Sequence, residues 1–134
     1  MSRRVTRLEL FKIVFEAEMN NILPETILED FISRDDIILS KKDIEFLTLY
    51  VSGISLHNEE LNLLLEETIE GWSLERIGTV EKALLKCSAY ELKYQETGHE
   101  IVVNEVIEIA KIYGDEKTPE FINGVLAKLI KEKP

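Results

Sequence analysis

Hydrophobic residues recur along most of this chain at intervals of three and four positions, with charged residues between them. That spacing matches the 3.6-residue period of a helix with a buried face, whereas a strand would alternate with a period of two. The pattern predicts helices at about residues 3–20, 24–32, 40–54, 58–71, 79–96, 102–113 and 118–130. The sequence therefore predicts an all-α fold of about seven helices.

Residues with known preferences for helix ends mark the breaks between these segments. Pro24 is placed to open the second helix, because proline is tolerated in the first helical turn. Ser40, followed three positions later by Asp43, resembles a capping box at the start of the third helix. Gly114 is expected to stop the sixth helix in a left-handed conformation, and Thr118 is expected to cap the seventh.

The length and composition of the chain predict a single domain. Its 134 residues, 45% of them hydrophobic, suffice for one ordinary core but not comfortably for two. Within residues 1–134, the first four helices are expected to form one subdomain, at about residues 1–71. The last three helices are expected to form a second subdomain, at about residues 72–134.

The last predicted helix contains Asn123 followed by Gly124, a pair that is otherwise a strong signal for a β-hairpin turn. The flanking hydrophobic residues do not alternate, and the pair falls on the polar side of a helix. Glycine inside a helix costs about 1 kcal/mol relative to alanine, so a compensating contact is expected. Close approach of another helix is the favoured explanation, and close approach of a ligand is the alternative.

Glu91 interrupts the hydrophobic stripe of the fifth predicted helix. A carboxylate on a buried face is unfavourable unless it is hydrogen-bonded. We therefore expect Glu91 to cap the start of a neighbouring helix or to meet a basic side chain. A structural role is favoured over catalysis, because no second titratable group can be identified beside it.

Charge is distributed unevenly along the chain. The formal net charge is −10, yet residues 1–12 carry Arg3, Arg4, Arg7 and Lys12 against the single acidic Glu9. Arginine binds phosphate and stacks on bases, so a small cluster at the start of a helix suits single-stranded RNA. The acidic remainder would repel nucleic acid and favour a basic partner. A basic start that arises by chance is the plain alternative.

The sequence lacks motifs for catalysis or metal binding. It has no glycine-rich phosphate loop, no G-x-S-x-G motif and no H-E-x-x-H motif. His57, His99 and Cys87 do not have the spacing of a zinc site, and the lone cysteine cannot form an internal disulfide. No segment resembles a secretion signal or a membrane span. We therefore expect a cytoplasmic protein that is not an enzyme and uses no cofactor.

Four stretches of the chain together resemble one known family. They are "SRRVTRLELFKIVFEAE", "WSLERIGTVEKALLKCSAYEL", "VVNEVIEIAKIYG" and "EFINGVLAKL", and their order and spacing are similar to those of the NusB transcription antitermination factors. The resemblance covers nearly the whole chain. It implies a fold of two helical subdomains, no enzymatic activity, and a complex with the ribosomal protein that is also called NusE. It further implies binding of boxA-type single-stranded RNA in ribosomal RNA leaders and delivery of the complex to elongating RNA polymerase.

The resemblance also implies which residues contact RNA. The arginine-rich start of the family falls on the basic residues at the beginning of this chain. An aromatic position in the first helix would support that surface, and the aromatic residue of the F-[VI]-N-G-[VI]-L pattern would stack on a base. Both aromatic residues also lie on hydrophobic stripes, so core packing is the alternative for them. The expected RNA contacts are Arg3, Arg4, Arg7, Lys12, Phe15 and Phe121.

The resemblance places the protein partner on the fifth helix. Glu81, with Leu85 and Ser88 on the same side of that helix, is expected to contact the basic partner. Two positions depart from the family pattern. Glu120 stands where many members have a basic residue, and Lys117 lies where they have an acidic or amide residue. These reversals leave open whether the start of the last helix contacts RNA.

Other interpretations of the sequence remain open. The chain could be a helical protein-interaction module in which the arginines are merely solvated. It could also be a NusB-like accessory domain of an RNA cytosine methyltransferase system, although it has no β/α unit or cofactor loop of its own. In addition, Leu10, Ile13 and Ala17 form a second apolar line on the first helix. That line predicts either burial or a homodimer that hides the arginines.

Overall fold

The computed structural model describes residues 1–69 and 73–132. Within these residues it contains seven α-helices, one short 3-10 helix and no strand, which confirms the predicted all-α fold. The elements are α1 (Arg3–Asn20), α2 (Pro24–Ser33), α3 (Lys41–Leu56), α4 (Asn58–Thr68), η1 (Leu74–Arg76), α5 (Thr79–Tyr94), α6 (His99–Tyr113) and α7 (Thr118–Glu132). Residues 70 and 71, where the fourth helix was expected to end, lie outside the described part of the chain.

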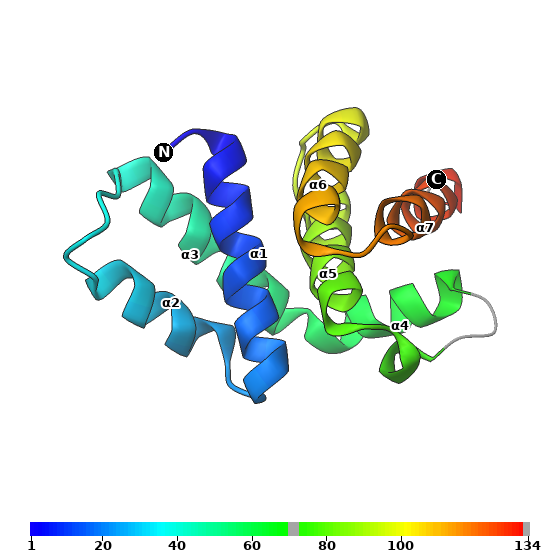
Figure 1. The fold of residues 1–134 in the computed structure, drawn as a ribbon, viewed down its shortest axis with the longest axis horizontal. Helices are drawn as coiled ribbons and strands as arrows, with labels where there is room; N and C mark the ends of the chain where they lie inside the picture. Colours follow the sequence, from blue (N-terminus) through cyan, green and yellow to red (C-terminus); the bar gives the residue numbers. More distant parts are fainter. Residues whose placement is uncertain (70–72, 133–134) are drawn as a thin grey trace.

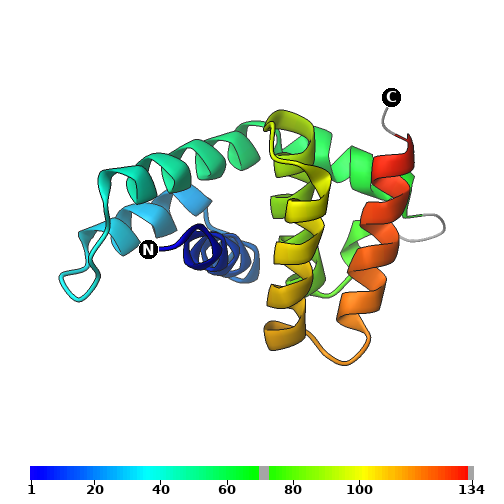
Figure 2. The ribbon, with the colours of Figure 1, turned by 90° about the horizontal axis from the view of Figure 1, so that it is seen from above.

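The helices α1 and α5 lie in the middle of the molecule, with the other helices on both sides of them. In Figure 1, α1, α2 and α3 occupy the left side, and α4 to α7 occupy the right side. The helix α1 packs on α2, α3 and α5, while α5 packs on α4, α6 and α7. Seen from above, α6 and α7 run side by side (Figure 2). The buried hydrophobic residues of both groups form one continuous cluster.

The helix α4 packs mainly against α5, and it contacts α3 and α7 to a smaller extent. The chain passes from one group to the other at His57, which ends α3 and directly precedes α4. The predicted subdomain boundary near residue 71 stays a prediction. Leu61 and Leu65 are fully buried, as the hydrophobic stripe of α4 predicts. A stripe shows that a face is buried but does not say which helix covers it.

The second apolar line of α1 is covered by the chain's own helices. Leu10, Ile13 and Ala17 are 2%, 3% and 6% exposed, respectively. These residues belong to the interior of the protein, so they offer no surface to a second copy of the chain. The expectation that this line forms a homodimer interface is therefore wrong, and the alternative of simple burial is correct.

The start of α3 confirms the predicted capping box. The Ser40 hydroxyl accepts a hydrogen bond from the backbone N–H of Asp43 at 3.1 Å, and the Asp43 carboxylate accepts one from the backbone N–H of Ser40 at 2.9 Å. The amino group of Met1 also lies 3.1 Å from Asp43 Oδ2. The cap of α3 therefore also holds the beginning of the chain.

The connection between α6 and α7 differs from the expectation. Gly114 has φ −90° and ψ −177°, which is extended backbone and not the left-handed stop that was predicted. A Cβ atom at this position would collide with the side chain of Thr118, so glycine permits a close approach here. The Asp115 carboxylate accepts hydrogen bonds from the backbone N–H groups of Lys117 and Thr118. Asp115 therefore provides the capping acceptor that was expected from the Thr118 hydroxyl.

Gly124 lies on the exposed outer side of α7. A Cβ atom built on it would meet no atom within 4 Å, so no other helix approaches it closely. The favoured explanation of close helix packing is therefore wrong. The alternative, close approach of a ligand, stays a prediction.

Candidate nucleic-acid interface

The first seven residues are tied to three different helices, and the three arginines among them point to different neighbours. The guanidinium of Arg3 lies over the Phe46 ring on α3, with 4.0 Å between Cζ and the ring centroid. Arg4 is paired with Glu105 on α6. Arg7 is paired with a carboxylate on α5. The basic start is therefore spread across the N-terminal end of α1.

Arg7 forms a buried, two-pronged ion pair with Glu91. Its Nε lies 3.1 Å from Oε1 and its Nη2 lies 2.7 Å from Oε2. The side chains are only 12% and 5% exposed. Glu91 Oε2 also accepts hydrogen bonds from the hydroxyls of Tyr50 at 2.8 Å and Thr97 at 2.9 Å. The expectation that Glu91 meets a basic side chain is confirmed, and its carboxylate joins α1, α3, α5 and the connection to α6.

Electrostatics keep Glu91 ionised despite its burial. Burial by itself raises the pKa of this carboxyl group, but the hydrogen bonds from Arg7 and Tyr50 outweigh that effect. The pKa of Glu91 therefore lies below its ordinary value. The same burial, together with the neighbouring carboxylate, raises the pKa of the Tyr50 hydroxyl. Tyr50 accordingly stays protonated and acts as a donor.

The burial of Arg7 argues against its predicted role as a direct RNA contact. Removing one partner of a buried ion pair leaves an uncompensated charge in the protein, which is strongly unfavourable. Arg7 would have to leave Glu91 to reach a phosphate. Arg7 instead anchors α1, the helix that carries the other basic residues predicted to contact RNA.

Arg3, Arg4 and Lys12 keep their charges at the surface. Arg4 is 69% exposed, and its Nε lies 3.1 Å from Oε2 of Glu105. Lys12 is 46% exposed and lies 3.4 Å from Glu9 on the same helix. Exposed ion pairs contribute little to stability, so these partners exchange readily for another anion. The contacts expected of these three residues stay predictions, and their exposure is compatible with them.

The two predicted aromatic contacts lie partly in the core. Phe15 is half-buried and stacks on Phe11, with 5.8 Å between ring centroids. Phe121 is half-buried and packs against the hydrophobic cluster. Both have a packing role in the structure, and their contacts with RNA stay predictions. Glu120 and Lys117, the departures from the family pattern, are exposed.

Two of the three residues expected to meet the protein partner are buried. Leu85 is 0% exposed and Ser88 is 3% exposed, with its hydroxyl donating to the backbone oxygen of Leu84 at 2.7 Å. Without surface, neither can contact a partner directly, so the structure argues against these two assignments. Glu81 is half-buried and accepts a hydrogen bond from the Thr118 hydroxyl at 2.6 Å. Its contact with a partner stays a prediction.

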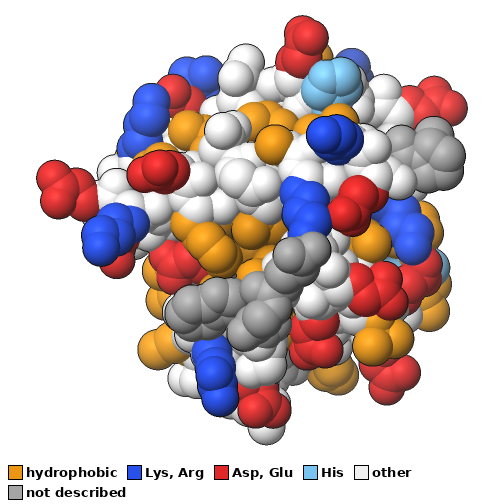
Figure 3. All heavy atoms as spheres, turned by 90° about the vertical axis from the view of Figure 1, so that its right-hand side faces the viewer, with side chains coloured by type: hydrophobic (Ala, Val, Ile, Leu, Met, Phe, Trp, Pro, Cys, Tyr) orange, Lys and Arg blue, Asp and Glu red, His pale blue; other side chains and the backbone are white. Residues whose placement is uncertain are grey.

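The surface on the side of α4 and α7 is rich in acidic side chains. Figure 3 shows acidic side chains spread over that face with basic side chains between them, and hydrophobic side chains gathered left of its centre. A basic protein would find a complementary field here. Sequence reasoning predicted an acidic body but did not place the charges on particular elements. The exposed acidic residues of α4 and η1 are Glu59, Glu60, Glu66, Glu67 and Glu75.

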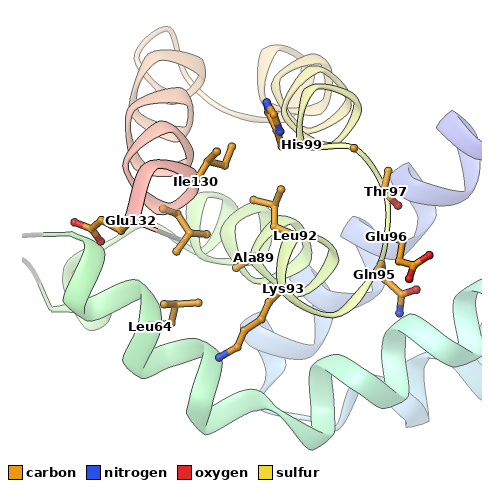
Figure 4. Close-up of a pocket in the computed structure, with 12 residues that line it drawn as sticks. Leu64, Ala89, Leu92, Lys93, Gln95, Glu96, Thr97, His99, Ile130 and Glu132 are labelled. Carbon is orange, nitrogen blue, oxygen red and sulfur yellow. The ribbon is translucent and has the colours of Figure 1, made fainter. Parts of the chain in front are cut away.

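A pocket of about 590 Å³ lies between α4, α5, α7 and the connection from α5 to α6 (Figure 4). Its walls are mainly apolar, and Lys93 at its edge is paired with Glu60. Within residues 1–69 and 73–132, no three His, Cys, Asp or Glu side chains are grouped as a metal site requires. No helix in the described part of the chain is long and apolar enough to span a membrane.

Comparison with known proteins identifies the family. A sequence model described as the NusB family matches residues 4–131 of this chain. The chain belongs to the NusB family. The transcription antitermination protein NusB of Pseudothermotoga lettingae is 38% identical to it, over 98% of this chain and 93% of that protein. NusB of Fusobacterium nucleatum is 35% identical, over 97% of this chain and 89% of that protein.

Solved NusB structures share the fold along nearly the whole chain. NusB of T. maritima superposes with a TM-score of 0.90 at 34% identity, covering 98% of this chain and 92% of that one. A second structure is a complex of the antitermination factors NusB and NusE with double-stranded RNA. Its matching chain has a TM-score of 0.86 at 25% identity, and each chain is 98% covered. The arrangement of helices described above is therefore that of the NusB family.

Proposed function

We propose that this chain is a transcription antitermination protein that binds RNA together with NusE. The NusB relatives support the role in antitermination, and the related complex contains both NusE and RNA. The observation in this chain that carries the proposal is the pair of exposed guanidiniums at the N-terminal end of α1. Arg3 and Arg4 face different neighbours there, the Phe46 ring and the Glu105 carboxylate.

The start of α1 suits a polyanion for two reasons. The partial positive charge of a helix N-terminus favours negative groups, and no acidic residue occupies the first turn of α1. Arg3 and Arg4 add full charges that can form bonds to phosphate oxygens. If each neutralises one phosphate of a single strand, log affinity falls with log salt at a slope of about −1.4. So shallow a slope means modest affinity, and a second protein beside the site would be needed for tight binding.

The acidic remainder of the chain would receive that second protein. The exposed carboxylates of α4 and η1, and Glu81 at the start of α5, suit a basic ribosomal protein. With NusE in place, the complex would bind boxA-type single-stranded RNA in ribosomal RNA leaders and be delivered to elongating RNA polymerase. A protein with this task would act in the cytoplasm and would not be an enzyme.

A charge-matched comparison tests the proposal. RNA binding is measured with and without NusE for the wild type, for Arg3→Ala/Arg4→Ala, and for a control, Arg76→Ala/Lys131→Ala. The control also removes two exposed positive charges, one in η1 and one in the last turn of α7, and α7 lies across the molecule from the N-terminus (Figure 1). We expect the first variant to lose at least tenfold in affinity and to show a shallower salt slope, while the control stays near wild type.

Two outcomes would contradict this proposal. Equal binding of RNA by the wild type and Arg3→Ala/Arg4→Ala would remove the arginines from the RNA site. Absence of RNA binding by the wild type, with NusE present, would leave a protein-interaction module as the better description of the chain.

A further inference from the structure

The guanidinium of Arg3 covers the ring of Phe46, and aromatic rings are surfaces on which RNA-binding proteins stack unpaired bases. Phe46 stacks on Tyr50 with 4.0 Å between ring centroids and 29° between ring planes. The Arg3 guanidinium also lies 4.0 Å from the Phe46 centroid. Two groups at that distance cannot share one face of a ring, so Tyr50 and Arg3 lie on opposite faces. Phe46 is thus supported from within and covered from outside by an exposed arginine.

We propose that Phe46 is a stacking platform for one unpaired base of bound RNA, uncovered when Arg3 leaves the ring for a phosphate. This inference rests on the proposed function and adds a residue that sequence reasoning did not select. Phe46 is a member of the hydrophobic core and is 9% exposed with Arg3 over its ring, whereas Phe15 and Phe121 are half-buried beside that core. What distinguishes Phe46 is the exposed Arg3 that covers its ring at the start of α1.

A base stacked on Phe46 should contribute more free energy than the Arg3 contact that it replaces. An exposed cation over an aromatic ring changes an equilibrium by about two- to fivefold. A base stacked on an aromatic side chain changes affinity by about five- to 150-fold, and the freed guanidinium gains a phosphate. The supporting side of the platform is fixed, because the Tyr50 hydroxyl donates to the buried carboxylate of Glu91. The ring therefore does not need to move when the base arrives.

A double-mutant cycle between protein and RNA tests this platform. Binding of a short boxA-type single-stranded RNA, with NusE present, is compared with RNAs that lack one base at successive positions. Phe46→Leu is expected to lower affinity by about tenfold and leave the salt slope unchanged, because Arg3 remains. At one position, removing the base is expected to weaken the wild type but not Phe46→Leu. The same sequence as a duplex is expected to show no such coupling, because paired bases cannot reach the ring.

Matched variants separate stacking from a loss of core packing. Phe31→Leu also removes a ring from the core, where Phe31 is 6% exposed with an arginine 6.0 Å from its centroid. It is expected to destabilise the protein without changing RNA affinity. Phe46→Tyr keeps the ring and is expected to bind within about twofold of wild type. If Phe46→Leu does not fold, the cycle is run with Arg3→Ala instead. For that variant, the slope of log affinity against log salt is expected to become shallower by about 0.7, while removal of the base still lowers affinity.

The outcomes distinguish this inference from the proposed function. If the wild type binds RNA and Phe46→Leu binds it equally, or if no base position is coupled to Phe46, the platform is overturned and the proposed function stands. If the wild type with NusE binds no RNA, both fall together.

Discussion

Arg4 and Arg7 lie three residues apart on the same helix, yet their environments are opposite. Arg4 is 69% exposed and its carboxylate partner is 18% exposed. Arg7 and its partner are 12% and 5% exposed, and two hydroxyls complete the hydrogen bonds around the carboxylate. One arginine is free to exchange its partner for an incoming phosphate, while the other fixes the helix that presents it. Similar residues in one basic cluster can therefore divide binding and positioning between them.

The strongest test of this difference is to remove the buried arginine. Arg7→Ala leaves Glu91 charged and unpaired inside the protein, so we expect it to lower the free energy of unfolding by about 3–5 kcal/mol. Urea denaturation at neutral pH measures the change. Arg4→Ala in the same assay is the control. A loss no larger than that of the control would show that the Arg7 pair is not an anchor.

The hydroxyl of Tyr50 should contribute less to the free energy of unfolding than the guanidinium of Arg7. Tyr50→Phe keeps the ring and its stacking on Phe46 but removes one donor to a charged, buried acceptor. We expect a loss of about 1.5–3 kcal/mol in the free energy of unfolding, from the same denaturation measurement. If Tyr50→Phe were as stable as wild type, Arg7 and Thr97 alone would satisfy Glu91.

The buried pair of Arg7 and Glu91 should also make the stability of the protein depend on pH in the acidic range. The pKa of Glu91 is lower in the folded protein than its ordinary value. Its contribution to stability is therefore complete above the unfolded pKa, at about 4.3, and is lost as pH falls through the folded value. We expect Glu91→Gln to be less stable than wild type at neutral pH and to lose less stability on acidification. Denaturation midpoints measured from neutral to acidic pH would show the two curves converging, and parallel curves would contradict the assignment.

The smallest effect on stability is expected at the exposed pair. Arg4→Ala removes only a surface contact with Glu105, so the unfolding midpoint should not change measurably. Its consequence should appear in RNA binding instead, as a salt slope that is shallower by about 0.7. A thermal melt and an RNA titration on the same preparation would make the comparison. A clear drop in the melting temperature would mean that Arg4, too, helps to fix α1.

Local signals in the sequence were sufficient for the helices and for some of their ends. The periodic hydrophobic positions gave the correct number of helices in the described part of the chain, and the Ser40–Asp43 cap formed as its spacing predicts. Such features depend on residues three or four positions apart. The conformation of Gly114 was not predicted, because a close approach of Thr118, not the helix end, requires glycine there.

Contacts between segments far apart in the chain could not be predicted from the sequence. Arg4 and Arg7 belong to one small cluster in the sequence, but their partners Glu105 and Glu91 lie on two other helices. The position of Glu91 in a hydrophobic stripe did indicate that a basic residue would meet it, although not which one. Leu85 fits a secondary face of its helix on a wheel and is fully buried in the structure. A wheel shows the period of a helix but not the number of helices packed around it.

Thr97 gives the pocket of Figure 4 a connection to the first helix. Its side chain lines that pocket and also donates to the carboxylate that holds Arg7. A small molecule bound between α4, α5 and α7 would contact this threonine. A ligand that displaces Thr97 would remove a donor from Glu91 and weaken the attachment of α1, without contacting the exposed arginines that we propose to bind RNA.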